Sequence, residues 1–173
     1  MELSVAKRLI HKGVATGATP QRWADLGAGK GLFTIALADL LLQESIVYAV
    51  DKDRLALRVV GSHPSTRIEV IEKDFLREHL GLPPLDGILI ANALHFVKDK
   101  VAFLSMLKAS LTAGGRMIVV EYDRETATQW VPFPVPFSGL RDLVTKSGFT
   151  SVTKLDEEPS VFNRVNIYSA VVS

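Results

Sequence analysis

Three glycines at alternate positions mark the stretch of this sequence best suited to bind a ligand. Gly27, Gly29 and Gly31 follow an apolar run over residues 22–26 and lead into an apolar helical pattern. Glycine allows positive φ and lets a ligand approach the backbone without a Cβ in the way. The first turn of the following helix offers N–H groups that have no partner within the helix. We therefore expect a ligand to bind at this strand, turn and helix start.

Four acidic residues at the ends of predicted strands are the second group that could do chemistry. They are Asp25, Asp51, Asp74 and Glu121. Ligands of doubly wound sheets bind at the carboxyl ends of the strands, so these carboxylates should lie along the binding edge. Asp51 follows the glycine turn by about the spacing expected of an acid that binds ribose hydroxyls. A carboxylate there would repel a 2′-phosphate, which argues against NADP.

The spacing of the glycines distinguishes between the possible classes of ligand. Dinucleotide-binding turns have the pattern G-x-G-x-x-G, whereas the third glycine of this turn, Gly31, comes one residue early. Asp25 lies two residues before Gly27, where its charge would repel a pyrophosphate. The same charge would attract a cation. The turn therefore favours a ligand that carries a sulfonium or an α-ammonium group.

The elements that must position these residues alternate between strands and helices along the chain. The predicted strands are apolar, which indicates a parallel sheet covered on both faces. No helix separates the last two strands, so one of them should be antiparallel. The predicted strands cover residues 22–26, 46–51, 67–73, 85–91, 116–120, 150–155 and 165–172, and the predicted helices cover 2–12, 31–42, 54–60, 99–111 and 138–146, the last with Ser138 as its N-cap.

Composition limits the classes of protein. The chain has 173 residues, of which 47% are hydrophobic and 23% are charged, with a net charge of +1 and no cysteine. These values predict a single globular domain over residues 1–173, in which the N-terminal helix within 1–18 could act as a lid. A disulfide framework and thiolate metal ligands are excluded, and no metal-ligand spacing is present. The near-neutral net charge gives no sign of a surface that binds nucleic acid. No apolar run is suited to a signal peptide or a membrane span, so we expect a cytoplasmic protein.

Residues 25–31 resemble the first motif of class I S-adenosylmethionine-dependent methyltransferases. Segments 47–51, 72–75, 85–97 and 111–121 are similar to later motifs of that family, in the same order. The resemblance implies an α/β fold with a Rossmann-like, doubly wound sheet of seven strands in the order 3-2-1-4-5-7-6, with strand 7 antiparallel. It also implies S-adenosylmethionine as the cofactor and S-adenosylhomocysteine as the product.

The same resemblance implies a role for each cofactor-binding residue. The backbone of the glycine turn would pack against the methionyl part and the ribose, while Asp25 would reach the ammonium group. Asp51 would hold the ribose hydroxyls, and Lys52 would back the adenine edge. Asp74 would accept a hydrogen bond from the adenine amino group, and the Phe75 N–H would meet an adenine nitrogen. Both Asp51 and Asp74 have an alternative interpretation as helix N-caps, Asp74 for residues 75–79.

Residues after the fourth strand would meet the transferable methyl group. Ala91 or Asn92 would face it, and His95 is a candidate general base, although a packing or pocket-lining histidine fits its position equally well. Several aromatic and polar residues beyond the strand ends are candidates for lining the acceptor site or for packing the loop over residues 130–136. These candidates are His95, Phe96, Glu121, Tyr122, Trp130 and Phe133.

The fourth motif favours a small-molecule acceptor. It reads Ala-Asn-Ala-Leu over residues 91–94 and not Asn-Pro-Pro-Tyr, which marks family members that methylate amino groups of nucleobases or of glutamine. The expected reaction is an in-line methyl transfer, dominated by proximity and orientation. The alternatives are an RNA or protein methyltransferase with a small basic cluster, a non-catalytic subunit that binds S-adenosylmethionine, and a nicotinamide-dependent reductase. The basic cluster consists of Lys7, Arg8, Lys12 and Arg22.

Overall fold

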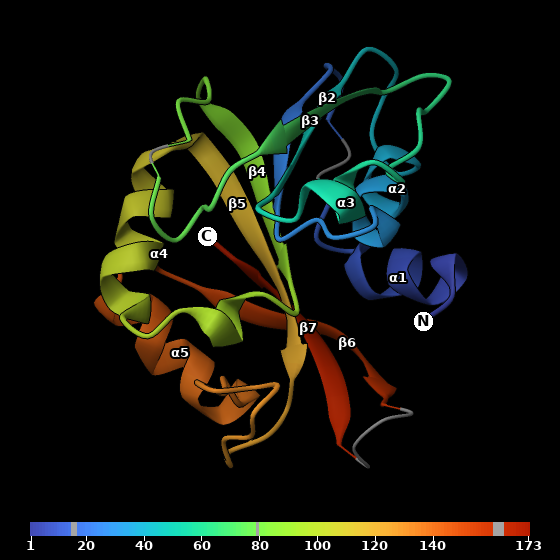
Figure 1. The fold of residues 1–173 in the computed structure, drawn as a ribbon. Coiled ribbons are helices and arrows are strands. Elements are labelled where there is room, and N and C mark those ends of the chain that lie inside the picture. Colours follow the sequence, from blue (N-terminus) through green and yellow to red (C-terminus); the bar gives the residue numbers. More distant parts are fainter. Residues whose placement is uncertain (15–16, 79, 161–164) are drawn as a thin grey trace.

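A computed structural model describes residues 1–14, 17–78, 80–160 and 165–173 of the chain (Figure 1). The helices are α1 (Leu3–Ile10), α2 (Leu32–Ala38), α3 (Arg54–Leu57), α4 (Lys100–Ala109) and α5 (Phe137–Lys146), with a short 3-10 turn at Leu94–Phe96. The strands are β1 (Arg22–Leu26), β2 (Ile46–Asp51), β3 (Arg67–Glu72), β4 (Leu85–Ala91), β5 (Leu111–Tyr122), β6 (Val152–Pro159) and β7 (Asn166–Val172). No helix in the described ranges is long and apolar enough to cross a membrane.

The strands form a seven-stranded sheet in the order β3-β2-β1-β4-β5-β7-β6. β1 pairs in parallel with β2 on one side and with β4 on the other, and β7 lies antiparallel between β5 and β6. The inner strands β1 and β4 are almost wholly buried, because helices cover both faces, and their sequences are accordingly continuous apolar runs. This topology confirms the predicted strand order and the antiparallel strand.

Helices pack on both faces of the sheet (Figure 1). α4 and α5 cover one face, where Leu104 and Leu140 are fully buried in the core, and α1 and α2 cover the other, where Leu37 is fully buried. Trp23 of β1 fills this second core. Its neighbour on β4 is Gly87, and a Cβ on Gly87 would stand 2.3 Å from the indole ring. A glycine here therefore lets β4 lie against a buried tryptophan.

The start of the last helix differs from the prediction. α5 begins at Phe137, and its N-cap is Pro136 rather than Ser138, which lies inside the helix. The Phe137 N–H, which has no partner within the helix, donates a hydrogen bond to the Asp123 carboxylate at 2.9 Å. A residue distant in the sequence thus takes over the capping role that was expected of Ser138.

Candidate functional site

The glycine turn combines tight packing with one open position. Gly27, Gly29 and Gly31 have φ values of 82°, 53° and 84°, a region that other residues rarely adopt. A Cβ on Gly27 would stand 2.6 Å from the Ala93 Cβ, and one on Gly31 would stand 3.0 Å from Val60. A Cβ on Gly29 would have no atom within 4 Å. The turn is therefore packed against the protein at two glycines and open to a ligand at the third.

The Asp51 carboxylate ties the end of β2 to this turn. One oxygen accepts a hydrogen bond from the Gly29 N–H at 2.8 Å, and the other accepts from the Asp53 N–H at 2.9 Å. The predicted alternative role for Asp51, that of a helix N-cap, belongs instead to Asp53, which accepts from two N–H groups of α3. Each Asp51 oxygen has a second lone pair, so the carboxylate can still accept hydrogen bonds from a ligand.

A pocket of about 180 Å³ borders the turn, and we call it the glycine-turn pocket. It brings together residues from the ends of β2, β3 and β4. Its lining residues are Gly27, Asp51, Lys52, Asp74, Phe75, Leu76, Asn92, Ala93 and Phe96. Six of the ten residues predicted to bind the cofactor line it, and the other four are Asp25, Gly29, Gly31 and Ala91. Leu76 and Ala93 were not predicted, although both adjoin predicted residues.

Asp25 lies buried beneath the turn, with 1% of its surface exposed. The Thr34 hydroxyl donates to its Oδ2 at 2.6 Å, whereas Oδ1 has no hydrogen-bond partner among the described residues. Burial raises the pKa of Asp25 to about 7, the Thr34 hydrogen bond opposes this shift, and the charge of Asp51 adds to it. No sequence pattern identified Thr34 as the partner of Asp25. The site thus holds a carboxyl group that can accept one more donor.

Asp74 caps a turn after β3 and lines the glycine-turn pocket. Its Oδ1 accepts from the Leu76 N–H at 3.1 Å, and its carbonyl oxygen accepts from the N–H groups of Arg77 and Glu78. The residues from 75 to 78 thus form a turn and not the helix that was predicted for 75–79, and residue 79 lies outside the described residues. The Phe75 N–H donates to no described residue. Capping therefore leaves the side chain of Asp74 on the pocket wall, next to a free backbone donor.

Asn92 connects the glycine-turn pocket to a larger one. It follows β4 with a φ of 53°, its N–H donates to the Val120 carbonyl at 2.8 Å, and its buried Oδ1 has no described partner. It lines a second pocket of about 440 Å³ beneath α1, which we call the α1 pocket. The α1 pocket is lined by Met1, Glu2, Val5, Leu32, Phe33, Asn92, Tyr122, Glu158, Pro159, Ser160 and Ile167. Ala91 is buried and lines neither pocket.

His95 and Glu121 form a buried pair behind the pocket walls. The side chain of His95 is 4% exposed and that of Glu121 is 1% exposed. The Glu121 carboxylate accepts hydrogen bonds from the His95 N–H at 3.1 Å and binds His95 Nδ1 at 2.8 Å. The centroid of the His95 ring lies 4.3 Å from that of Phe96 and 6.3 Å from that of Tyr122. Neither His95 nor Glu121 lines the two pockets that meet at Asn92, although Phe96 and Tyr122 each line one of them.

The loop over residues 130–136 lies beside this pair and away from both pockets. Trp130 is 77% exposed, and neither it nor Phe133 lines the glycine-turn pocket or the α1 pocket. The Phe133 N–H donates to the His95 carbonyl at 3.0 Å, and the Lys100 ammonium lies 5.4 Å from the centre of the Phe133 ring. The described contacts of Phe133 thus fit the packing alternative.

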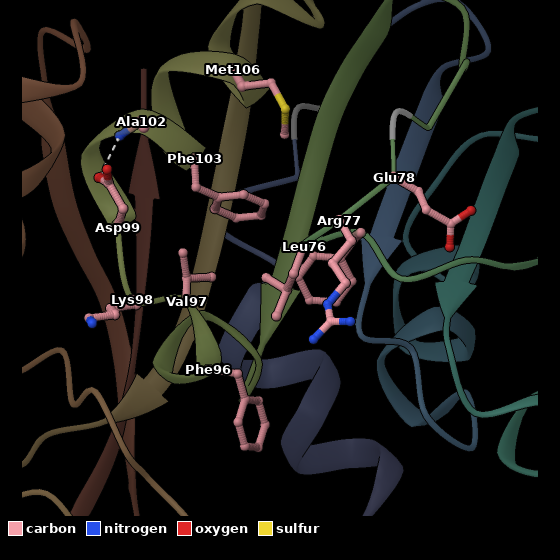
Figure 2. Close-up of a pocket in the computed structure, with 11 residues that line it drawn as sticks. Leu76, Arg77, Glu78, Phe96, Val97, Lys98, Asp99, Ala102, Phe103 and Met106 are labelled. Atoms are coloured by element: carbon pink, nitrogen blue, oxygen red, sulfur yellow. Dashed lines mark hydrogen bonds between the residues drawn. The ribbon is translucent and has the colours of Figure 1, made fainter.

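A third pocket, of about 440 Å³, opens beside the glycine-turn pocket (Figure 2). The two share Phe75, Leu76 and Phe96, and the third pocket extends from there to Phe103 and Met106 of α4. The rings of Phe75 and Phe103 lie 5.9 Å apart. The third pocket therefore continues an apolar wall of the glycine-turn pocket, on a side that does not include Asn92.

A family model described as a methyltransferase domain matches residues 24–117, just over half of the chain. The chain belongs to the methyltransferase domain family. The match begins next to Asp25 and includes the glycine turn and the ends of β2, β3 and β4, which form the glycine-turn pocket. No curated protein is similar enough in sequence to match the chain.

Solved structures of methyltransferases share the fold. A S-adenosylmethionine-dependent methyltransferase of Leishmania major has a TM-score of 0.74 at 17% identity, over 97% of this chain and 71% of that one. An arsenic(III) S-adenosylmethionine methyltransferase of Chlamydomonas reinhardtii has a TM-score of 0.70 at 21% identity, over 96% and 72% of the two chains. A 1,6-didemethyltoxoflavin-N1-methyltransferase of Burkholderia thailandensis has a TM-score of 0.70 at 19% identity, over 98% and 76%. Family and fold together confirm the predicted class I S-adenosylmethionine-dependent methyltransferase.

Proposed function

We propose that this methyltransferase binds S-adenosylmethionine in the glycine-turn pocket and transfers its methyl group to a small-molecule acceptor. The observation that carries the proposal is that two pockets meet at Asn92, one bordered by the glycine turn and the other large enough for a second small molecule. The sulfonium of the cofactor activates the methyl group when it is bound. The protein then has to bind and orient the two reactants, which is where most of the acceleration arises in such a transfer.

The residues around the glycine-turn pocket fit this cofactor. Gly29 leaves open space where a Cβ would stand, and Asp51 keeps a free lone pair on each oxygen for the two ribose hydroxyls. Asp74 and the Phe75 N–H offer an acceptor and a donor to the adenine ring, and Lys52 borders the same pocket. We assign the adenosine part of the cofactor to these residues.

Asp25 supports a cationic ligand in particular. Its buried Oδ1 lacks a partner among the described residues, and an unpaired carboxylate oxygen is costly to bury unless a donor reaches it. We assign this oxygen to the ammonium group of the methionyl part, reached directly or through one water molecule. A pyrophosphate would instead add negative charge near the carboxylates of Asp25 and Asp51, which disfavours a nicotinamide dinucleotide.

A small-molecule acceptor fits better than RNA. Two members of the basic cluster are already paired within the fold: Lys7 lies 3.0 Å from the Asp39 carboxylate, and Arg8 binds Asp156 and Glu158. Cations paired in this way are less available to neutralise phosphates. Two of the similar structures carry names with small acceptors, arsenic(III) and 1,6-didemethyltoxoflavin.

For His95 the geometry favours packing over general-base catalysis. Its Nδ1 is held by Glu121, its side chain is buried, and it lines neither pocket. A base is required only if the acceptor keeps its proton until the methyl group is transferred. We therefore propose that His95 shapes the turn after β4, and that the acceptor enters the reaction as a free nucleophile.

Calorimetric titration with S-adenosylhomocysteine tests the cofactor assignment. We expect the wild-type protein to bind it and Asp51→Asn to bind it at least about tenfold more weakly, because an amide has one carbonyl oxygen in place of two carboxylate oxygens. Asp53→Asn is the matched control, since it keeps the N-cap of α3 and lines neither pocket. A wild-type protein that does not bind S-adenosylhomocysteine would refute the proposal, and equally tight binding of NADH would favour the reductase.

Formation of S-adenosylhomocysteine from S-adenosylmethionine tests the acceptor. We expect it to form with members of a small-molecule panel and not with total RNA. If S-adenosylhomocysteine forms with RNA and with no small molecule, the proposed small-molecule acceptor is wrong and the protein is an RNA methyltransferase. Cofactor binding with no turnover of any acceptor would favour the non-catalytic subunit.

A further inference from the structure

We propose that the α1 pocket binds the methyl acceptor and selects uncharged or cationic molecules with an apolar body over anionic ones. This inference rests on the proposed function, because it names the acceptor class of the same site. Three observations carry it: the contact of the pocket with Asn92, the chemistry of its walls, and the ion pairs that hold α1 over it.

The position of the α1 pocket suits an acceptor. Asn92 is the residue that it shares with the glycine-turn pocket among the described lining residues. The buried Oδ1 of Asn92 has no described partner, so it can accept a hydrogen bond from an N–H or O–H group of a bound molecule. Tyr122 reaches the same pocket from the end of β5. A molecule in the α1 pocket therefore lies next to the residue that also borders the cofactor site.

The walls of the α1 pocket are apolar, and their charged side chains are acidic. Val5, Phe33 and Ile167 supply apolar surface from α1, α2 and β7. The charged side chains among the described lining residues are Glu2 and Glu158, and no Lys, Arg or His lies among them. Arg8 pairs with Glu158, so the unpaired charge among these side chains is that of Glu2, and an anionic molecule would bring a second unpaired negative charge next to it.

The hydroxyl of Tyr122 adds no charge to the walls of the α1 pocket. Burial raises the pKa of Tyr122, and the nearby carboxylate of Glu121 adds to the shift. The side chain thus stays a neutral phenol that can donate or accept a hydrogen bond. The preference of the described walls against anions therefore comes mainly from Glu2, because Glu158 is paired with Arg8.

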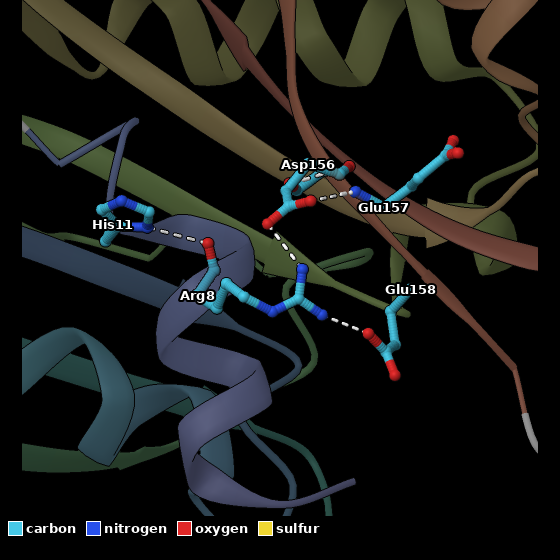
Figure 3. Close-up of polar contacts among 6 residues, drawn as sticks. Arg8, His11, Asp156, Glu157 and Glu158 are labelled. Atoms are coloured by element: carbon cyan, nitrogen blue, oxygen red, sulfur yellow. Dashed lines mark hydrogen bonds and ion pairs between the residues drawn. The ribbon is translucent and has the colours of Figure 1, made fainter.

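Ion pairs between α1 and β6 hold the outer wall in place (Figure 3). The Arg8 Nη1 lies 2.7 Å from the Asp156 carboxylate, and Nη2 binds Oε2 of Glu158. Arg8 thereby connects the helix that carries Glu2 and Val5 to the strand that carries Glu158. The pocket is bounded by two elements that are far apart in the sequence and joined by this arginine. Its acidic character remains at Glu2, which has no ion pair among the described residues.

Three probes of similar shape test the charge preference: 1-naphthylmethylamine, 1-naphthylmethanol and 1-naphthoate. Each is titrated by calorimetry with and without saturating S-adenosylhomocysteine. We expect the amine and the alcohol to bind at least about tenfold more tightly than the carboxylate. Equal or tighter binding of the carboxylate, or no binding of any probe, would overturn the inference. The separate titration of S-adenosylhomocysteine shows whether the proposed function itself fails.

Substitutions in the pocket test its location. Val5→Trp should fill the pocket and abolish binding of the amine, with the affinity for S-adenosylhomocysteine changed less than about twofold. Glu2→Gln should strengthen binding of the carboxylate about threefold, because it removes one negative charge and leaves the Arg8 pairs intact. Glu157→Gln is the matched control, since Glu157 pairs with Lys154 and does not line the pocket. Unchanged amine binding by Val5→Trp, or equal effects of Glu2→Gln and Glu157→Gln, would contradict the assignment.

Discussion

Two side-chain oxygens, Oδ1 of Asp25 and Oδ1 of Asn92, are buried without a hydrogen-bond partner among the described residues. Buried polar atoms in native proteins are nearly always paired, so such exceptions call for an explanation. Both residues lie at carboxyl ends of neighbouring parallel strands, β1 and β4. A ligand bound along this edge of the sheet would supply the missing donors.

Cofactor affinity should depend on pH through Asp25. Its pKa of about 7 means that the carboxyl is mostly protonated at pH 6 and mostly ionised at pH 8. The ammonium group of the ligand favours the ionised form, so the affinity for S-adenosylhomocysteine should rise by about tenfold from pH 6 to pH 8, with proton release at pH 6. Calorimetry in two buffers of different ionisation enthalpy measures both effects. Asp25→Asn should bind more weakly and without this pH dependence.

The carboxyl group of Asp25 should also make the stability of the folded protein depend on pH. Its folded pKa lies above the unfolded value of 3.8, so its favourable contribution is fully present below that value and is lost as the pH rises through about 7. The melting temperature of Asp25→Asn, relative to wild type and without cofactor, should therefore be higher at pH 8 than at pH 5, by about 8 °C. A difference that does not change between these pH values would contradict the raised pKa.

The buried pair of His95 and Glu121 should contribute more to stability than a surface pair. Glu121→Gln leaves one carbonyl oxygen where two carboxylate oxygens are hydrogen-bonded to His95, and we expect it to lower the free energy of unfolding by about 2 kcal/mol. Urea denaturation measures this change. The comparison is Asp142→Asn, which breaks an exposed pair with Lys146 at 2.7 Å and should cost less than about 1 kcal/mol. Equal losses would show that burial adds nothing to the first pair.

At the scale of elements, the glycines of the turn between β1 and α2 differ in whether they serve packing or ligand binding. Gly27 and Gly31 face neighbouring side chains, whereas Gly29 faces open space, although all three have positive φ. Replacement of the first two glycines would therefore disturb packing. Replacement of Gly29 would add only the strain of its backbone and an atom on the ligand side of the turn.

Gly29→Ala should accordingly weaken cofactor binding out of proportion to its effect on folding. We expect a loss of about 1 kcal/mol in unfolding free energy, and a loss of affinity for S-adenosylhomocysteine of about tenfold or more. Gly114→Ala is the control: Gly114 has a φ of 82° and also faces open space, but it lies in β5 and not in the turn that borders the glycine-turn pocket. It should show a similar loss of stability with normal affinity. Equal affinities of the two variants would place the ligand elsewhere.

At the scale of the whole molecule, the sequence predicts the parts of the site that are local in the chain. The glycine turn, Asp51 and Asp74 each lie at or just past the end of a strand, and parallel strands bring their carboxyl ends to one edge. The strand order followed from the resemblance of five segments to one family. Six of the ten expected cofactor residues consequently line one pocket in the structure.

Pairings between distant segments were not predictable in this way. Besides Asn92, the described lining of the α1 pocket comes from positions 1–5, 32–33, 122, 158–160 and 167, and no motif connects these segments. The contacts of Thr34 with Asp25 and of Glu121 with His95 likewise depend on the packing of whole elements. The predicted lining by Trp130 and Phe133 assumed that the aromatic loop faces the strand ends at the pockets, whereas Phe133 contacts the 3-10 turn and α4.

The order of the sheet leaves β3 and β6 at its two edges. An edge strand offers unpaired backbone groups to other chains and is a common start of aggregation. Both edges of this sheet carry charged side chains along much of their length, and β6 ends in Pro159, which cannot donate a backbone hydrogen bond. On β6 the glutamate that lines the α1 pocket belongs to this charged edge. The strand that borders the α1 pocket therefore also discourages the sheet from growing into a fibril.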